Sequence, residues 1–309
     1  MKKILLWILI VIAGLIVIPV AYFSIRQAIV NARIERDWRT APAALPKLLT
    51  TSKLEILPLY EVNSADPDLQ TGHGVSYLVS TDSATVLLDL GDSPDESALL
   101  PSLQNLQALG ISPDEIDAMV FSHPHWDHFG GMTAWQTKTI PFDQLAGHLR
   151  SVPIFVPVEM QIEGASLTHS AQPTLIAVDA ATTGVIPYSE IFPLNVVDPA
   201  GYEQGLIVDV AGKGPVLITG CGHPGLERLV TRVEMLLGKP IVGVVGGLHY
   251  GAATAAQLQP HIDFFKARSP QLVALSPHDT SAAALGIIQA AFPDAFQAVV
   301  VGQAIQFGR

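Results

Sequence analysis

Short apolar runs alternate with amphipathic stretches from residue 54 to the end of the chain. Residues 54–62, 75–80 and 84–91 are apolar runs broken by turn residues, as expected of adjacent strands. The stretch 93–110 opens with Ser, Pro and Asp, ends in Gly and has the apolar spacing of a helix. The run 118–122 predicts a buried strand that leads directly into a loop rich in histidine.

The second half of the chain follows the same coarse order of strands, a polar loop and a helix. Its predicted strands lie at 205–210, 215–220, 241–245, 272–276 and 298–308, and its predicted helices at 225–237, 253–267 and 280–291. Two such halves predict an α/β sandwich in which helices cover mixed sheets. Residues 138–200, rich in Pro, Thr and Ala, predict an irregular insertion that shapes or covers a site.

The N-terminus carries an uncharged apolar run from Ile4 to Phe23, directly after two lysines. A helix of about 20 residues spans roughly 30 Å, the hydrocarbon thickness of a bilayer. A signal peptide usually has a shorter apolar stretch and a small-x-small cleavage site, whereas this run ends PVAYFSIR. We therefore expect residues 1–25 to be an uncleaved transmembrane helix, with a cleaved signal peptide as the alternative.

The segments beside this helix complete the domain prediction. Residues 26–53 predict a stem and a Pro-containing linker, and residues 54–309 a single large domain. Lysines before the apolar run favour a cytoplasmic N-terminus, although four arginines follow the run closely. We expect a single-pass protein of the cell membrane whose domain lies on the extracytoplasmic side.

Composition excludes some partners. The net charge is −11 over 309 residues, so no basic stripe is present to neutralise nucleic-acid phosphates, and we expect no nucleic-acid partner. The single cysteine, Cys221, excludes an intramolecular disulfide framework. The oligomeric state stays open.

Residues that can bind metal follow four of the predicted strands. His123 follows the strand at 118–122, and three later strands are followed by Cys221 and His223, by His249, and by His278 with Asp279. A single histidine in such a loop is typical of a solvated turn. Four strand ends together indicate one common edge of the sheets, where open α/β folds bind ligands.

The first of these loops, FSHPHWDHFGG (121–131), has the spacing of a metal site. His123 and His125 are two residues apart, which in an extended segment directs both rings to one side. Asp127 and His128 follow as the chain turns and can face a second ion. Imidazole and carboxylate together suit Zn, Fe or Mn better than Ca or Mg.

HPHWDH fits the HxHxDH signature of the metallo-β-lactamase superfamily, and the chain resembles that superfamily. The resemblance extends to one subgroup, the dihydropterin ribofuranosyl-aminobenzene phosphate synthase-like metal-dependent hydrolases. It covers about residues 54–308 through blocks that occur in order: HGVSYLVS, VLLDLG, FSHPHWDHFGG, TTGVIP, EQGLIVDV, LITGCGHPG and VVGGLHYGA. It implies a four-layer αββα sandwich, here with an N-terminal transmembrane helix, and two divalent metal ions, zinc first and Mn or Fe as alternatives.

The resemblance also implies roles for individual residues. One metal is expected on His123, His125 and His223, and the second on Asp127, His128 and His278. Cys221 stands where many relatives have a metal-bridging Asp; it is either a ligand or a small buried apolar residue. His249 is either a further ligand or a pocket residue, and His73 either a pocket residue or a structural one. The other histidines, His148, His169 and His261, lack a strand-end setting.

Two departures from the subgroup concern the rim of the expected pocket. Gly222 stands where the subgroup commonly has serine. Asp279, Thr280 and Ser281 stand where it usually has Cys-Thr-Gly. These departures leave the substrate open.

The expected function is that of a membrane-anchored hydrolase that uses a metal-bound hydroxide on a small phosphoester, lactone or similar molecule. Asp127 would orient the hydroxide or shuttle its proton, and His249 or His73 would protonate the leaving group. One alternative is a transferase that condenses a pterin-type precursor with a ribosyl-aminobenzene phosphate. Another is a metal-binding or sensing domain without turnover. β-Lactamase activity is disfavoured, because the subgroup blocks differ from those of the antibiotic-degrading enzymes.

Overall fold

The computed structural model describes residues 2–95, 99–139, 149, 151–160, 165, 167–190, 194–197 and 199–308. The chain divides into two compact units. One unit consists of Met1–Ala41 and Pro187–Gly201, and the other of Pro42–Ile186 and Tyr202–Arg309. The second unit contains both large sheets and every residue predicted for the metal site.

The first unit is dominated by one long helix, α1 (Lys2–Arg39), which has Pro19 inside it. The helix runs through the predicted anchor and into the first part of the predicted stem. Among the described residues one stretch, Gly14–Arg39, is long and apolar enough to cross a membrane, with a mean hydropathy of 1.5 and none of its best window buried. A membrane span and a signal sequence both have this length and composition. The same unit contains the short helix α4 (Leu194–Val197).

The first large sheet has the strand order β16-β2-β3-β4-β5-β6-β7. The pairs from β16 to β4 are antiparallel, and the pairs from β4 to β7 are parallel. The strands are β16 (Ile305–Gly308), β2 (Lys53–Tyr60), β3 (Ser76–Ser80), β4 (Thr85–Leu88), β5 (Ala118–Val120), β6 (Ile154–Val156) and β7 (Leu167–His169).

The second large sheet has the order β15-β14-β13-β12-β9-β8, and β1 also pairs with β12. The pairs β15–β14 and β14–β13 are parallel, whereas β12 is antiparallel to both β13 and β9. The strands are β15 (Leu272–Leu275), β14 (Gly243–Gly246), β13 (Gly214–Ile218), β12 (Leu206–Val210), β9 (Ala180–Thr182), β8 (Leu175–Ala177) and β1 (Thr50–Thr51). A separate pair is formed by β10 (Ile186–Ser189) and β11 (Ala200–Glu203).

Alternating side chains place the two sheets face to face. In β4, Val86 and Leu88 belong to a core shared with Val208 and Ile218 of the second sheet. Leu87 points to the opposite face, as the two-residue period of a strand requires, and joins a second core. The second core includes Leu103 and Leu106 of α2 (Pro101–Ala108).

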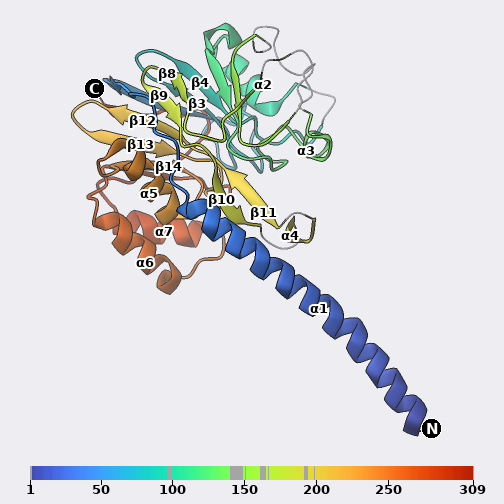
Figure 1. Cartoon of the computed structure of the whole chain (residues 1–309). Coiled ribbons are helices and arrows are strands. Elements are labelled where there is room, and N and C mark those ends of the chain that lie inside the picture. Colours follow the sequence, from blue (N-terminus) through green and yellow to red (C-terminus); the bar gives the residue numbers. More distant parts are fainter. Residues whose placement is uncertain are drawn as a thin grey trace. The chain divides into compact units, whose positions relative to one another are not determined.

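Three helices cover the outer face of the second sheet: α5 (Leu226–Leu237), α6 (Ala255–Lys266) and α7 (Ala282–Ala291) (Figure 1). Apolar side chains of these helices face Val244 and Val273 of the sheet, together with Phe292, which follows α7. The remaining helical elements are α3 (Met132–Thr137) and a 3₁₀ turn at Pro113–Glu115. The four-layer αββα architecture predicted from the sequence is confirmed.

Local sequence fixes where the second-half helices begin and end. α6 begins after a capping box in which the Thr254 hydroxyl accepts a bond from Gln257 N and the Gln257 side chain accepts one from Thr254 N. α7 begins after Ser281, whose hydroxyl accepts from Ala284 N. α5 ends at Gly238, which adopts a left-handed φ of 67°.

Three boundaries differ from the sequence prediction. α2 starts at Pro101 rather than near residue 93, because a residue before proline is disfavoured in the α region and Leu100 is extended. The sheets start at β1, before the predicted domain boundary at residue 54. The expected insertion at 138–200 supplies four strands, β6 to β9, to the two sheets. Each of these strands has three residues, too few for the two-residue alternation of a strand to be recognised in the sequence. His148 lies outside the described residues.

We predict that Ile56→Ala lowers the free energy of unfolding by about 2–5 kcal/mol, because it opens a cavity in the core between the sheets. Ile56 is fully buried in β2. Urea denaturation in detergent measures the effect. Met235→Ala is the matched control, since this side chain is 55% exposed, and should change the value by less than about 0.5 kcal/mol. Equal effects of the two substitutions would contradict the assignment of Ile56 to this core.

Candidate metal centre

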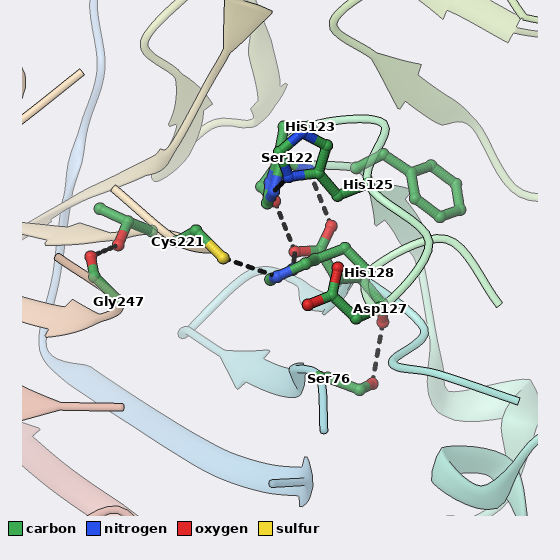
Figure 2. Close-up of polar contacts among 12 residues, drawn as sticks. Ser76, Ser122, His123, His125, Asp127, His128, Cys221 and Gly247 are labelled. Atoms are coloured by element: carbon green, nitrogen blue, oxygen red, sulfur yellow. Dashed lines mark hydrogen bonds and ion pairs between the residues drawn. The ribbon is translucent and has the colours of Figure 1, made fainter. Parts of the chain in front are cut away.

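The loops after four strands deliver the predicted side chains to one place. The loop after β5 carries the HPHWDH residues (Figure 2), and the loops after β13, β14 and β15 carry Cys221, His223, His249 and His278. His73 joins them from the segment between β2 and β3. Grouped by ligand atoms within 4.8 Å of one another, the residues brought together are His73, His123, His125, Asp127, His128, Cys221, His223, His249 and His278. Three of the groups share members, and the fourth, His73, Asp127 and His278, joins them through the 3.5 Å contact of His278 Nε2 with Cys221 Sγ.

The first group consists of His123, His125 and His223, the three residues expected on one metal. Nδ1 of His125 lies 3.1 Å from Nε2 of His123 and 3.2 Å from Nε2 of His223. Nitrogen ligands about 2.0–2.1 Å from a tetrahedral zinc ion lie about 3.3 Å from one another. The spacing of these nitrogen atoms therefore fits a metal of this size.

The remaining residues are grouped differently from the expectation. Nε2 of His128 lies 3.0 Å from Sγ of Cys221, and these two form a group with His123. Asp127 and His278 form another group with His73, with 3.2 Å between His278 Nε2 and Asp127 Oδ2. Cys221 lies between the two, because its sulfur is also 3.5 Å from His278 Nε2. The cysteine is thus placed as a ligand would be, at the centre of the second half of the site.

Asp89, at the end of β4, orients two of the histidines. Its Oδ1 accepts a bond from Ser122 N at 2.7 Å, and its Oδ2 accepts from Ser122 Oγ at 2.6 Å. Since the Ser122 hydroxyl proton points to Asp89, Ser122 Oγ accepts from Nδ1 of His123 at 2.9 Å. Oδ2 of Asp89 also accepts from His128 Nδ1 at 2.7 Å. Both rings therefore turn Nε2 toward the cluster, as a carboxylate behind a histidine ligand does in metal sites.

His278 is oriented in another way. The backbone N–H of Gly74 donates to its Nδ1 at 3.0 Å, so a neutral ring carries its proton on Nε2, which faces Asp127. Gly74 permits this approach, because a Cβ there would lie 2.2 Å from the carbonyl oxygen of Asp127. In this geometry His278 donates a hydrogen bond to Asp127. Coordination through Nε2 would require loss of that proton, and the ligand role of His278 stays a prediction.

Two further carboxylates, Glu203 and Glu61, hold the loops of His223 and His278. Glu203 accepts from Gly222 N at 2.8 Å and from His223 N at 2.7 Å. Glu61 accepts from the hydroxyl of Ser276, whose oxygen in turn accepts from the backbone N–H of His278 at 3.3 Å. Each loop thus ends on a buried acceptor that fixes its backbone.

Asp279 holds the loop of His249. Its Oδ2 accepts from His249 N at 2.8 Å, and its Oδ1 accepts from the Thr280 hydroxyl. His249 has a left-handed φ of 56°, which is unfavourable for a residue with a Cβ and has to be held by its surroundings. Its ring lies 4.5 Å from that of His223, centroid to centroid.

Sequence reasoning named Asp279 only as a residue that can bind metal, and it did not identify Glu61, Asp89 or Glu203. Asp89 and Glu203 stand inside the blocks VLLDLG and EQGLIVDV, but nothing in a single sequence shows which backbone groups they reach. Glu61 and Asp279 stand at the ends of apolar runs, where a carboxylate usually meets solvent. Their complete or near-complete burial is visible only in the structure.

The cluster has a large excess of buried negative charge. Five carboxylates are less than 9% exposed: Glu61, Asp89, Asp127, Glu203 and Asp279. In the described part of the chain no lysine or arginine forms an ion pair with any of them. Burial raises the pKa of both Glu203 and Asp279 to about 7, the response expected when charge is enclosed without a counterion.

His123 and His223 do not supply the missing positive charge. Burial lowers the pKa of His123 and His223 well below the usual value, and neighbouring histidines lower it further. His128 differs, because Asp89 outweighs burial and raises its pKa to about 9. Burial and the nearby carboxylates raise the pKa of Cys221 well above the usual value, so a thiolate needs a cation beside it. Divalent cations match both the donor atoms and the missing charge.

We predict that Asp89→Asn weakens metal binding about 10- to 100-fold while the fold is retained, because an amide nitrogen cannot accept from His128 and Ser122. Competition with a chromogenic chelator measures the affinity, and circular dichroism checks the fold. Asp179→Asn is the matched control: Asp179 is 2% exposed and accepts from the Thr81 and Ser83 hydroxyls, outside the cluster. Unchanged affinity in the Asp89 variant would contradict its role in orienting ligands.

Comparison with known proteins agrees with the geometry. Residues 69–141 match the model of the metallo-β-lactamase superfamily, and this segment contains His73, His123, His125, Asp127 and His128. The 7,8-dihydropterin-6-methyl-4-(β-D-ribofuranosyl)-aminobenzene-5′-phosphate synthase of Methanocaldococcus jannaschii is 24% identical over 274 residues, which cover 76% of this chain and 90% of the synthase.

Two crystal structures have a similar fold. A metal-dependent hydrolase of the β-lactamase superfamily matches with a TM-score of 0.60 at 20% identity, covering 83% of this chain and 100% of that one. The metallo-β-lactamase fold protein YhfI from Bacillus subtilis matches with a TM-score of 0.52 at 13% identity, with the same coverage. Residues 69–141 thus match the metallo-β-lactamase superfamily, and the domain shares its fold with these two crystal structures.

Proposed function

We propose that this protein is a membrane-anchored, metal-dependent hydrolase that holds two divalent ions, zinc in first place, and acts on a small phosphoester, lactone or similar molecule. The observation that carries the proposal is the convergence of nine residues with ligand-type side chains, Asp127 among them, with four further buried carboxylates; among the described residues no lysine or arginine pairs with these five carboxylates. Members of the superfamily typically bind divalent metals such as zinc. The apolar helix α1 supports the anchor.

The donor atoms divide into two sets. His123, His125 and His223 would hold one ion, as expected from the sequence. Asp127, His128 and Cys221 would hold the other, with His278 either a further ligand or the donor that fixes Asp127. Bound ions of this kind lower the pKa of water to about 7 and polarise the oxygen of the substrate's reacting group.

Asp127 is suited to orient a hydroxide and to relay its proton, but not to retain one. Burial raises its pKa, but the hydrogen bond from His278 and the nearby histidines outweigh burial and hold the pKa well below the usual range. The carboxylate is therefore ionised at neutral pH. His73 lies 3.6 Å from it and is 55% exposed, so a proton can pass from Asp127 to solvent through this ring.

His249 is suited to bind the leaving group. It is exposed while its neighbours are buried, and its backbone is fixed by Asp279. Burial and the proximity of His278 lower its pKa, so the ring is neutral at pH 7. A neutral imidazole can still donate its N–H to a departing oxygen, as a held electrophile rather than as an imidazolium.

A second candidate is a transferase of the pterin type, favoured by the similarity to the archaeal synthase. The two activities are separated by product analysis. Incubation with a dihydropterin pyrophosphate and a ribosyl-aminobenzene phosphate would give a condensed product only for the transferase. Release of an acid or phosphate from a simple ester would support the hydrolase.

We predict that His123→Ala removes bound metal and lowers kcat/KM for p-nitrophenyl phosphoesters at least about 100-fold, because the ion that activates water loses a ligand. Metal content and hydrolysis are measured on the same preparations. His169→Ala is the control, since His169 bonds the carbonyl of Pro157 outside the cluster. Folded wild-type protein without bound metal would contradict both the hydrolase and the transferase and favour a domain without turnover.

We predict that His249→Asn lowers kcat about 10²- to 10⁴-fold with unchanged metal content, because it removes the donor to the leaving group. Asparagine tolerates the left-handed backbone of this position, so the loop should keep its shape. Steady-state kinetics and metal analysis are both needed. Loss of a metal ion in this variant would show instead that His249 is a ligand.

A further inference from the structure

We propose that the described part of the segment Pro187–Gly201 (residues 187–190, 194–197 and 199–201) makes a second contact with the membrane, with α4 resting on the lipid at the level of the headgroups. The contact would set how deeply the unit that contains α1 sits in the bilayer. The proposal rests on the membrane anchoring proposed above, and the closing experiment separates the two.

The character of α1 changes at a defined level. Tyr22 and Ile25 are each 62% exposed and Phe23 is 41% exposed, so the helix presents aromatic and aliphatic side chains outward at this level. Arginines follow at 26, 33, 36 and 39. Aromatic residues followed by basic ones are typical of the membrane–water boundary. The boundary on α1 therefore lies near residues 22–26.

The segment is hydrogen-bonded to α1 at this level. Nη1 of Arg26 donates to the carbonyl oxygen of Val196 at 2.7 Å, and Nε2 of Gln27 donates to the hydroxyl of Ser189 at 2.5 Å. Val196 and Ser189 both belong to the same compact unit as the helix. Since a helix rises 1.5 Å per residue, Val196 is attached about 5 Å beyond Phe23.

The chemistry of the segment fits lipid. α4 has the sequence LNVV, and Val196 is 41% exposed on it. The charged residues of the segment are Glu190 and Asp198, with no lysine or arginine between residues 187 and 201, and the Glu190 carboxylate accepts a bond from the Tyr188 hydroxyl. An apolar helix without strongly hydrated cations can lie at the boundary of headgroups and acyl chains.

Continuity with α1 favours lipid over a soluble partner. Tyr22, Ile25 and Ile29 lie three and four residues apart, so they form one exposed apolar face of the helix. This face runs from the apolar span up to the level at which Val196 is attached. A bilayer that surrounds the span covers both, whereas a water-soluble partner would have to approach within a few ångströms of the lipid.

The test places a fluorophore at single cysteines in the full chain, reconstituted in phosphatidylcholine nanodiscs with and without phosphatidylglycerol. The native Cys221 is 3% exposed and is protected from labelling. Val196→Cys reports on α4, and Ile16→Cys, at a position 60% exposed in the apolar run, reports on the anchor. Ala32→Cys, exposed on α1 about 9 Å beyond Arg26, is the water-side control.

We expect lipids with a shallow nitroxide to quench the label at Val196 at least about twofold more than the label at Ala32, because only the former lies at the headgroup boundary. Dependence on phosphatidylglycerol would show that the arginines add to the contact. Equal quenching at Val196 and Ala32, with strong quenching at Ile16, overturns the contact and leaves the anchor in place. Absence of quenching at Ile16 overturns both, without bearing on the hydrolase activity.

Discussion

Asp89 lies at the end of β4, where its two oxygens accept hydrogen bonds from the backbone and hydroxyl of Ser122 and from the ring of His128. These bonds decide which nitrogen of His123 and of His128 faces the cluster, and so whether the rings can act as ligands. The parallel pairing of β4 with β5 brings Asp89 beside the histidine loop. The fold thus contributes to the chemistry by placing an acceptor behind the ligands.

Buried carboxylates also hold three later loops of the site, and this has an electrostatic consequence. Glu203, Glu61 and Asp279 fix the loops of His223, His278 and His249 through backbone or hydroxyl groups. A buried carboxylate without a counterion is costly, so loops held in this way are most stable with cations at the centre. The proposed ions would replace protons on the ligands and offset the buried charge, so their binding would be coupled to the folding of these loops.

Local sequence was sufficient for the features that depend on neighbouring residues. The strands, the second-half helices and the HPHWDH loop follow from period and spacing, and the four-layer fold from the resemblance. The partners of Asp89 could not be predicted, because Ser122 and His128 lie 33 and 39 residues further along the chain. Those of Glu203 depend on the register of the antiparallel pair β12–β13, which brings Gly222 and His223 beside it. The same holds for Cys221, whose place between His128 and His278 depends on three separate loops.

Asp279 connects the unusual part of this sequence with its chemistry. The subgroup that the chain resembles usually has cysteine at this position, and a neutral thiol would be a weak acceptor for a backbone N–H. The carboxylate accepts from His249 N and fills the space above Gly247, where a Cβ would lie 2.3 Å from Oδ2. His249 is thereby held in a backbone conformation that its own side chain disfavours. Asp279, which departs from the subgroup, thus positions His249, the proposed donor to the leaving group. A difference in substrate from the subgroup would therefore arise at this rim of the pocket rather than at the metal ligands.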